Sequence, residues 1–284
     1  MRIVVTGANG QLGMDVCAAF TETNDVYALT HEQMDITDAA QVEQVLGSIK
    51  PQCVINTAAM HHVEKCETDP VQAYTVNAMG TRNLAKACAM LDAHFIHLST
   101  DYVFNGEKNT PYTERDAPMP LNVYGNTKLS GEHYALTTWN KSSVVRVSAI
   151  YGIHPCRAKG GLNFVMLMLK LAKERPQLRV VDDEIVTPTS TAAISKQLLR
   201  IAEEKVFGLF HATCHGQCSW YTFAARIFEL AGIKTDLQKA DPGEFPVKVA
   251  RPAYSVLEND RLKALNMDCM PDWEESLRLF LKSI

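Results

Sequence analysis

The sequence predicts an α/β fold, with a Rossmann-type doubly wound parallel sheet and a smaller carboxyl-terminal α/β lobe for binding substrate. Through the first half of the chain, short β-rich runs alternate with amphipathic segments of helical length, a pattern typical of a parallel sheet covered by helices. A glycine-rich turn directly follows the first run and opens a helix. With 284 residues and 46% hydrophobic content, the chain is long and apolar enough to bury a large core.

The individual elements follow from hydrophobic spacing and turn residues. In the segment 70–91, Ala73, Val76, Leu84 and Leu91 recur mostly at helical spacing, so one face of that helix should lie on the sheet. The expected helices span 11–20, 39–49, 70–91 and 121–139. The expected strands span 2–6, 26–30, 53–56, 94–99, 143–147 and 178–181.

The regular alternation loosens after Tyr151, where the chain turns from the sheet to a second region. We expect residues 1–151 to form the dinucleotide-binding domain and residues 178–206 to return to it. Residues 152–177 and 207–284 are then expected to form the substrate-binding lobe. No linker is long enough to separate independent domains, so the two parts should share a cleft.

Charge and composition exclude several classes of function. The formal net charge is -4 and no run of like charges stands out, so we expect neither nucleic acid nor a membrane surface as a partner. The chain starts in a strand-like segment, with no leader and no long apolar span, which predicts a cytoplasmic protein. Its eight cysteines are scattered, mostly in apolar runs, so we expect no disulfide framework.

The glycine-rich turn predicts a dinucleotide site. Gly7, Gly10 and Gly13 follow the first strand and open the first helix. Such glycines allow a tight turn, close approach of the backbone to a pyrophosphate, and close packing of helix on strand. Their spacing of three and three is typical of short-chain dehydrogenases, although a glycine turn alone is a modest signal.

Further positions should complete the cofactor site. The second strand ends at Thr30 without the acidic residue that holds a ribose 2′-hydroxyl, which favours NADPH over NADH, although no arginine is present to bind the 2′-phosphate. Asp35 and Ile36 are expected beside the adenine, and Ala58 and Ala59 along the ribose and nicotinamide unless they only form a packing turn. The full expected cofactor set is Gly7, Asn9, Gly10, Gln11, Leu12, Gly13, Thr30, Asp35, Ile36, Ala58, Ala59, Asn77, Tyr124 and Lys128.

A threonine, a tyrosine and a lysine form the candidate catalytic set. Tyr124 and Lys128 are four residues apart in a predicted helix, so their side chains share one face. An ammonium beside a phenol favours the phenolate, so we expect Lys128 to lower the pKa of Tyr124. Thr100 follows the fourth strand, where ligands bind in open α/β sheets, and should hydrogen-bond the substrate oxygen. Carbonyl reduction with Tyr124 as the proton donor is the expected reaction.

On these residues the chain resembles the dTDP-4-dehydrorhamnose reductase family of the extended short-chain dehydrogenases. The run Ser99-Thr100-Asp101-Tyr102-Val103-Phe104 is specific to this branch. The resemblance also covers Gly7-Ala8-Asn9-Gly10-Gln11-Leu12-Gly13, Asp35-Ile36-Thr37-Asp38, Ile55-Asn56-Thr57-Ala58-Ala59, Tyr124-Gly125-Asn126-Thr127-Lys128, Asn163-Phe164-Val165, Pro188-Thr189, Ser219-Trp220-Tyr221 and Arg251-Pro252. It implies NAD(P)H-dependent reduction of a 4-keto-6-deoxyhexose, most directly dTDP-4-dehydro-L-rhamnose to dTDP-L-rhamnose.

The resemblance also implies a substrate site, with departures. Family members place an aromatic residue where this chain has Ala149, which leaves the sugar open. Some members bind magnesium between subunits through glutamates, but Asp15 and Ala192 stand at two of those places, so we expect no metal; a homodimer remains open. The expected substrate-binding residues are Val63, Thr100, Asp101, Tyr102, Ala149, Asn163, Phe164 and Arg251.

Three rival interpretations remain. A dehydratase would have Asp-Glu after Thr100, whereas this chain has Asp101-Tyr102. An epimerase shares the Tyr and Lys and retains its cofactor. A non-enzymatic relative, the regulatory β subunit of methionine adenosyltransferase, shows that the fold does not determine the function. In addition, His61-His62 are expected to border the cleft or to be incidental, and a zinc site at His211, Cys214, His215 and Cys218 is disfavoured.

Overall fold

A six-stranded parallel sheet forms the centre of the computed structural model, which describes residues 1–156, 160–241, 243–245 and 248–284. The strand order is β10-β5-β4-β3-β1-β2, and every neighbouring pair is parallel. The strands are β1 (Arg2–Thr6), β2 (Asp25–Leu29), β3 (Cys53–Asn56), β4 (His94–Thr100), β5 (Ser142–Val147) and β10 (Gly208–His211). The predicted doubly wound α/β fold is confirmed.

The strand order reverses at β1, because β2 lies on one side of it and β3 on the other. In open α/β sheets, ligands bind outside the carboxyl ends of the strands at such a switch point. Strands β3, β4 and β5 are buried along their whole length, as expected for strands covered on both faces.

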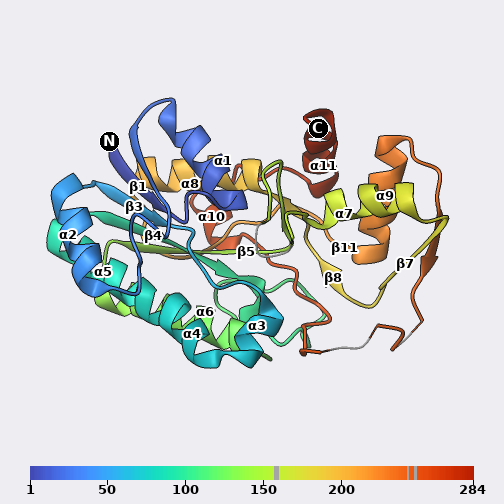
Figure 1. The fold of residues 1–284 in the computed structure, drawn as a ribbon, viewed down its shortest axis with the longest axis horizontal. Helices are drawn as coiled ribbons and strands as arrows, with labels where there is room; N and C mark the ends of the chain where they lie inside the picture. Colours follow the sequence, from blue (N-terminus) through green and yellow to red (C-terminus); the bar gives the residue numbers. More distant parts are fainter. Residues whose placement is uncertain (157–159, 242, 246–247) are drawn as a thin grey trace.

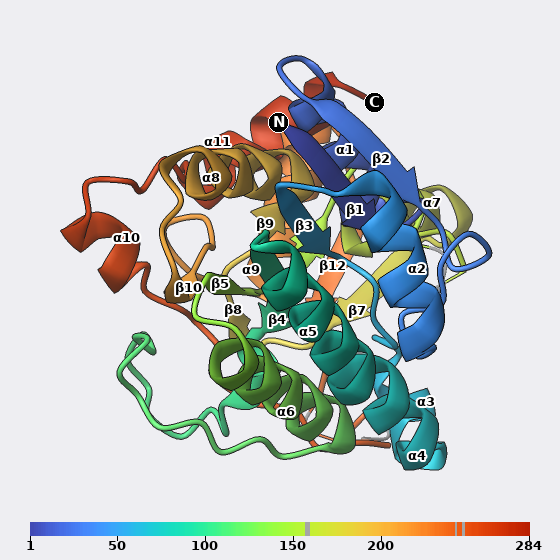
Figure 2. The ribbon, with the colours of Figure 1, turned by 90° about the vertical axis from the view of Figure 1, so that its left-hand side faces the viewer.

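Two helical layers cover the sheet (Figure 2). On one face lie α1 (Gln11–Thr21) and α8 (Thr191–Glu204), which share a core with Ile3, Val5 and Phe210. On the other face lie α2 (Ala39–Ile49), α5 (Thr81–Leu91) and α6 (Val123–Thr138), packed against Val4, Val54 and neighbouring residues. Alternate side chains of β1 therefore pack into the cores on opposite faces of the sheet, because successive side chains of a strand point to opposite faces.

The segment predicted as one helix at 70–91 is divided. It consists of α4 (Pro70–Tyr74), a π-helical turn η1 (Thr75–Gly80) and α5, preceded by the short, unpredicted α3 (Val63–Thr68). Such π-helical turns inside helices are rare and often occur at functional sites. This one carries Asn77, which bonds the loop at Met60.

The smaller lobe contains short two-stranded sheets and several helices, among them α7 and α9 at the right of Figure 1. Strand β7 (Gln177–Val180) pairs with β12 (Asp236–Lys239), β8 (Ile185–Val186) with β11 (Cys218–Ser219), and β6 (Ile150–Tyr151) with β9 (Thr189–Ser190). The helices are α7 (Phe164–Glu174), α9 (Trp220–Ala231), α10 (Asp260–Ala264) and α11 (Trp273–Lys282). Among the residues described, none of the helices is long and apolar enough to cross a membrane.

Two strand placements differ from expectation. The strand expected at 178–181 does not return to the main sheet, because β7 alternates between exposed and buried residues and pairs with β12. Conversely, Gly208–His211 was expected in the smaller lobe but pairs with β5 as the sixth strand. Phe210 is fully buried in the core beneath α8, which explains why this edge strand joins the sheet.

Candidate active site

A cavity of about 290 Å³ opens at the carboxyl ends of β1, β4 and β5. It joins three groups of residues that lie far apart in the sequence. The glycine turn contributes Gly10, Gln11, Leu12 and Gly13; the catalytic set contributes Thr100, Tyr124 and Lys128; the expected substrate set contributes Val63, Asp101, Tyr102, Ala149, Asn163 and Phe164. One cavity therefore unites most of the residues that the sequence singled out.

The glycine turn has the geometry that the spacing predicts. Gly7 has a φ of 66°, and a Cβ there would lie 2.7 Å from the backbone nitrogen of Ala58. A Cβ at Gly13 would collide with the carbonyl oxygen of Gly7, so α1 packs directly on the turn. A Cβ at Gly10 would lie 3.2 Å from that same oxygen, and Gly10 lines the cavity. The turn thus presents bare backbone to any ligand.

The residues present fit a dinucleotide. Helix α1 begins at Gln11 with Gly10 as its N-cap, which provides no side-chain cap, so the first backbone N–H groups are available to an anion. The Nε2 of Gln11 is buried and has no hydrogen-bond partner among the described residues. A buried donor without a partner costs free energy that a bound phosphate oxygen would recover.

The other expected cofactor residues lie outside the described lining of the cavity, apart from Ala59. The carboxylate of Asp35 accepts hydrogen bonds from the backbone nitrogen and the hydroxyl of Thr37, at 2.9 and 2.8 Å. Ile36 is buried against Gly80. The expected cofactor residues outside the described lining also include Gly7, Asn9, Thr30, Ala58 and Asn77.

Asn77 has a structural role in this arrangement. Its Oδ1 accepts from the Met60 nitrogen at 2.8 Å, and its Nδ2 donates to the Met60 carbonyl and to Thr127 Oγ1, both at 2.9 Å. Both amide hydrogens are therefore engaged. Asn77 ties the loop after β3 to α6, where Tyr124 and Lys128 reside.

Helix α6 places Tyr124 and Lys128 one turn apart, both on the cavity. The helix starts where the Asn122 side chain accepts from the Gly125 nitrogen at 2.8 Å. Gly125 is required here, because a Cβ would collide with the carbonyl oxygen of Tyr102 in the 3₁₀ turn η2 (Asp101–Val103). This close contact brings the phenol of Tyr124 to Thr100.

Burial dominates the electrostatics of Tyr124. It raises the pKa of the phenol, and a hydrogen bond with the Thr100 side chain partly opposes that rise. The expectation that Lys128 lowers the pKa of Tyr124 is therefore wrong for this structure, because desolvation outweighs the other influences on the phenol. A phenol with a raised pKa stays protonated and is suited to donate a proton.

Asp101 lies beneath the cavity as a buried carboxyl group. Its Oδ1 accepts from Thr100 Oγ1 at 3.0 Å and its Oδ2 accepts from Ser148 Oγ at 2.7 Å. Burial raises its pKa despite these bonds. Asp101 thus orients the Thr100 hydroxyl.

Lys128 is nearly inaccessible to solvent. Its Nζ donates to the Leu98 carbonyl at 2.6 Å and lies 3.4 Å from Nε2 of His97. Burial lowers the pKa of this ammonium to about 8, while Glu132 raises it. Lys128 can therefore change its charge near neutral pH.

The substrate side of the cavity is built by the smaller lobe. Asn163 caps α7 by accepting from the Met166 nitrogen at 3.1 Å, and it donates to the Gly152 carbonyl at 2.7 Å. Ala149 has a φ of 43°, an uncommon conformation for a residue with a side chain. Arg251 is exposed and absent from the described lining. Burial raises the pKa of Tyr102 and of Glu184, and the charge of Arg251 partly opposes both rises.

Sequence reasoning missed several lining residues. Glu184 reaches the cavity, where burial raises its pKa and its Oε2 accepts from Trp220 Nε1 at 3.1 Å. Ser255 and Cys156 also line it. His61, expected either to border the cleft or to be incidental, lines the cavity as well, and its Nε2 lies 3.8 Å from the sulfur of Cys156. The sequence contained a signal for Glu184, because it is an acidic residue between two short strands to which no role had been assigned. Ser255 and Cys156 had none.

Asp15, which stands where family members place a metal ligand, contacts neutral or weakly basic partners. Its carboxylate accepts from the hydroxyl of Thr191 and lies 3.4 Å from Nε2 of His154. Likewise, His211 Nδ1 lies 3.1 Å from the backbone oxygens of Tyr112 and Glu258. In the part of the chain that the structure describes, no three His, Cys, Asp or Glu side chains gather to hold a metal.

Comparison with known proteins assigns the chain to a family. The family described as RmlD substrate binding domain matches residues 1–284. This chain belongs to that family. It is 36% identical to the spore coat polysaccharide biosynthesis protein SpsK of Bacillus subtilis over 282 residues, which cover 99% of this chain and 97% of that protein.

Two solved structures of the family match over nearly the whole length. The dTDP-4-dehydrorhamnose reductase of Clostridium acetobutylicum is 40% identical, with a TM-score of 0.95 and coverage of 100% of this chain and 99% of that one. The dTDP-4-dehydrorhamnose reductase of Bacillus anthracis, crystallised with NADP, is 36% identical, with a TM-score of 0.95 and the same coverage. The family that the sequence motifs predicted is confirmed.

Proposed function

We propose that the chain is an NADPH-dependent reductase of the 4-keto group of a nucleotide-linked 6-deoxysugar, with dTDP-4-dehydro-L-rhamnose as the first candidate substrate and dTDP-L-rhamnose as its product. One observation carries the proposal: a single cavity joins the glycine turn to Thr100, Tyr124 and Lys128 and continues to the smaller lobe. The similarity to family members over the full length supports the same reaction class.

In this proposal the three catalytic residues act on the substrate oxygen. A bound nicotinamide dinucleotide supplies the hydride when the complex forms. The Tyr124 hydroxyl donates its proton to the oxygen that becomes an alkoxide. The Thr100 hydroxyl, whose single hydrogen is donated to Asp101 in this structure, turns to donate that hydrogen to the substrate oxygen instead. Lys128 in its charged form stabilises the developing negative charge and holds the ribose. Thr100 and Lys128 are buried, so little solvent competes with their interactions.

The cofactor preference rests on the end of β2. Thr30 ends that strand without a carboxylate, and the neighbouring His31 side chain is 80% exposed. An acidic residue there would repel a 2′-phosphate, so its absence favours NADPH. The Bacillus anthracis relative crystallised with NADP supports this choice. NADH remains the alternative to be compared directly.

The substrate preference rests on the smaller lobe. Val63, Asp101, Tyr102, Ala149, Asn163 and Phe164 are proposed to contact the nucleotide-sugar. The exposed Arg251 is proposed to contact it as well. Ala149 leaves space where an aromatic residue is typical. The cavity therefore suits either the rhamnose precursor or a related 4-keto-6-deoxysugar with a bulkier substituent.

The proposal includes a division into lobes and an environment for the protein. Residues 1–151, together with α8 and β10, form the dinucleotide-binding lobe, while α7, β7, β12, α9 and α11 belong to the substrate-binding lobe. A cytoplasmic location and a homodimer remain predictions, to be checked by cell fractionation and by light scattering.

The decisive experiment offers 4-keto-6-deoxy sugars linked to dTDP, UDP, GDP or CDP, each with NADPH and with NADH. We expect one NADPH to be oxidised per sugar reduced, with the dTDP-linked sugar the best substrate. Sugar conversion without net cofactor oxidation would favour an epimerase. No conversion of any sugar, together with stable binding to a second enzyme, would favour a regulatory subunit.

A further inference from the structure

We infer that His97 is a positioning residue that acts through Lys128: the Asn56 amide holds the imidazole with its proton on Nε2, and this N–H, directed at the lysine amine, favours the neutral form of Lys128. The predicted effect on turnover rests on the proposed function, whereas the inferred position of the His97 proton and its effect on Lys128 do not.

The orientation of the Asn56 amide is determined first. Its Oδ1 accepts from the backbone nitrogen of Ala58 at 3.1 Å and from the hydroxyl of Thr6 at 2.7 Å. A backbone N–H can only donate, so the oxygen of Asn56 must face Ala58. The amide nitrogen consequently faces Nδ1 of His97, at 3.1 Å.

The tautomer of His97 follows from that orientation. An amide nitrogen has no acceptor site, so Nδ1 of His97 must accept its hydrogen. A neutral imidazole carries its single proton on the other nitrogen, which here is Nε2. His97 is fully buried, and burial together with Lys128 holds its pKa well below the usual range, so the ring remains neutral.

The Nε2–H of His97 then meets Lys128. The two nitrogens are 3.4 Å apart, while the lysine also donates to the Leu98 carbonyl. An ammonium group has only donors, so it would place N–H against N–H in a buried space. A neutral amine has a lone pair that can accept the imidazole proton. This geometry favours the neutral lysine.

The groups around Lys128 divide into opposing influences. Glu132, one turn along α6, favours the charged lysine, although its carboxylate is shared with Arg146 at 2.6 and 2.8 Å and with Ser99 at 2.5 Å. Asp101 on η2 is engaged by Ser148 and Thr100. From β3 and η1 the facing side chains, Asn56 and Asn77, are uncharged. The His97 N–H and the burial of the amine favour the neutral lysine, so they oppose the effect of Glu132.

The fit of the imidazole is specific. His97 lies where α6 carries Gly131, and a Cβ at that glycine would come within 3.2 Å of Nε2. The helix therefore leaves room for the ring beside Lys128. Tyr124 lies on the same helix face, so the charge of the lysine acts where the phenol donates its proton.

Nuclear magnetic resonance of the full chain without cofactor tests the proton arrangement. Long-range correlation of hydrogen and nitrogen in histidine-labelled protein should show His97 neutral and protonated on Nε2 from about pH 5 to about pH 8. Carbon-labelled lysine should show Lys128 titrating at about 8.

Two variants change the contact in different ways. His97→Gln can turn its amide oxygen toward Lys128, and Asn56→Asp can accept a proton from Nδ1 and so transfer the acceptor lone pair to Nε2. Both should raise the Lys128 midpoint by about one pH unit. In the proposed reaction, the alkaline limit of kcat should rise with it.

A matched control lies on the same strand. His94 is also buried, but its Nε2 contacts Ser143 at 2.7 Å at the other end of β4. His94→Gln should leave the Lys128 midpoint unchanged. A wild-type His97 protonated on Nδ1, or a Lys128 midpoint that stays in place in both His97→Gln and Asn56→Asp, overturns the inference whether or not the chain reduces keto-sugars.

Discussion

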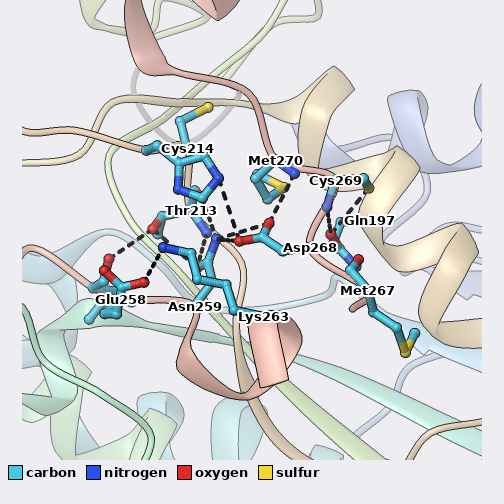
Figure 3. Close-up of polar contacts among 12 residues, drawn as sticks. Gln197, Thr213, Cys214, Glu258, Asn259, Lys263, Met267, Asp268, Cys269 and Met270 are labelled. Atoms are coloured by element: carbon cyan, nitrogen blue, oxygen red, sulfur yellow. Dashed lines mark hydrogen bonds and ion pairs between the residues drawn. The ribbon is translucent and has the colours of Figure 1, made fainter. Parts of the chain in front are cut away.

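Two buried polar clusters in this protein differ in how completely their polar groups are hydrogen-bonded. Around Asn259, shown in Figure 3, polar groups satisfy one another: its Nδ2 donates to the Thr213 carbonyl at 2.8 Å, and its Oδ1 accepts from the Thr213 nitrogen at 3.1 Å. Asp268 accepts from the Met270 nitrogen at 3.0 Å. Gln197 closes the cluster by donating to the Met267 carbonyl and accepting from the Cys269 nitrogen.

The active-site cluster, at the carboxyl end of the sheet, leaves polar groups incompletely satisfied. Gln11 has a buried donor without a described partner, Lys128 has a lowered pKa, and Ala149 has a positive φ. Such features cost stability, and they persist where a ligand or a reaction uses them. The Asn259 cluster therefore stabilises the fold, whereas the active-site cluster retains groups that a ligand or a reaction can use. The following predictions test that contrast.

The largest effect should come from Tyr124→Phe. Removing the proton donor should lower kcat about a hundredfold to ten-thousandfold, the usual contribution of a general acid. The thermal midpoint should change little, because the ring stays in place. The assay is the initial rate of NADPH oxidation with keto-sugar, with cofactor binding followed by fluorescence as the control. Retained turnover would show that another group donates the proton.

The next effect concerns stability alone. Asn259→Ala removes the centre of the Figure 3 cluster and leaves the buried groups of Thr213 unpaired, so we expect a loss of about 3 kcal/mol in the free energy of unfolding. Urea denaturation measures it. The kcat of the folded fraction should stay within about twofold of the wild type. A stable but inactive variant would contradict the division of roles.

A pair of glutamines gives a direct comparison of the clusters. Gln11→Ala should weaken NADPH binding about tenfold, since one hydrogen bond to a charged phosphate is lost, with little change in stability. Gln197→Ala should lower the stability and leave NADPH binding almost unchanged, because its amide is hydrogen-bonded within the protein. Calorimetric titration and denaturation are compared for both. Equal losses of stability would show that Gln11 has an internal partner.

The smallest effect is a pH dependence of cofactor binding. The pKa of Lys128 is lowered to about 8, so its positive charge is present below that pH and is lost as the pH rises through it. Affinity for NADPH should therefore fall several-fold over the alkaline range, and Lys128→Met should remove this dependence. Titrations at a series of pH values measure it. An affinity that rises with pH would assign the effect to another group.

The glycine turn and the catalytic spacing were readable from the sequence because their chemistry is local. Gly7 has a positive φ, and a Cβ at Gly13 would collide with the carbonyl oxygen of Gly7, so both requirements act within the turn, although the Ala58 backbone also excludes a side chain at Gly7. Tyr124 and Lys128 share a helix face by periodicity alone. The alternation of strands and helices likewise predicted the sheet, since each element buries a face defined by its own residues.

Other features depended on distant contacts. The placement of β7 and β10 was decided by which partner strand lay nearby, which no local pattern encodes. Glu184 and Ser255 reach the cavity from loops of the smaller lobe. The raised pKa of Tyr124 follows from desolvation in the folded protein, so a helix-based argument gave the wrong direction.

By itself, the sequence determined the fold class and the family and indicated the residues of the proposed cofactor and catalytic sites, because these follow from short-range spacing and steric requirements. Only the tertiary structure decided the charge states of those residues and the contacts of His97. Desolvation and hydrogen bonding depend on groups brought together from β3, β4 and α6, and their effects on proton affinity exist only once these elements are packed.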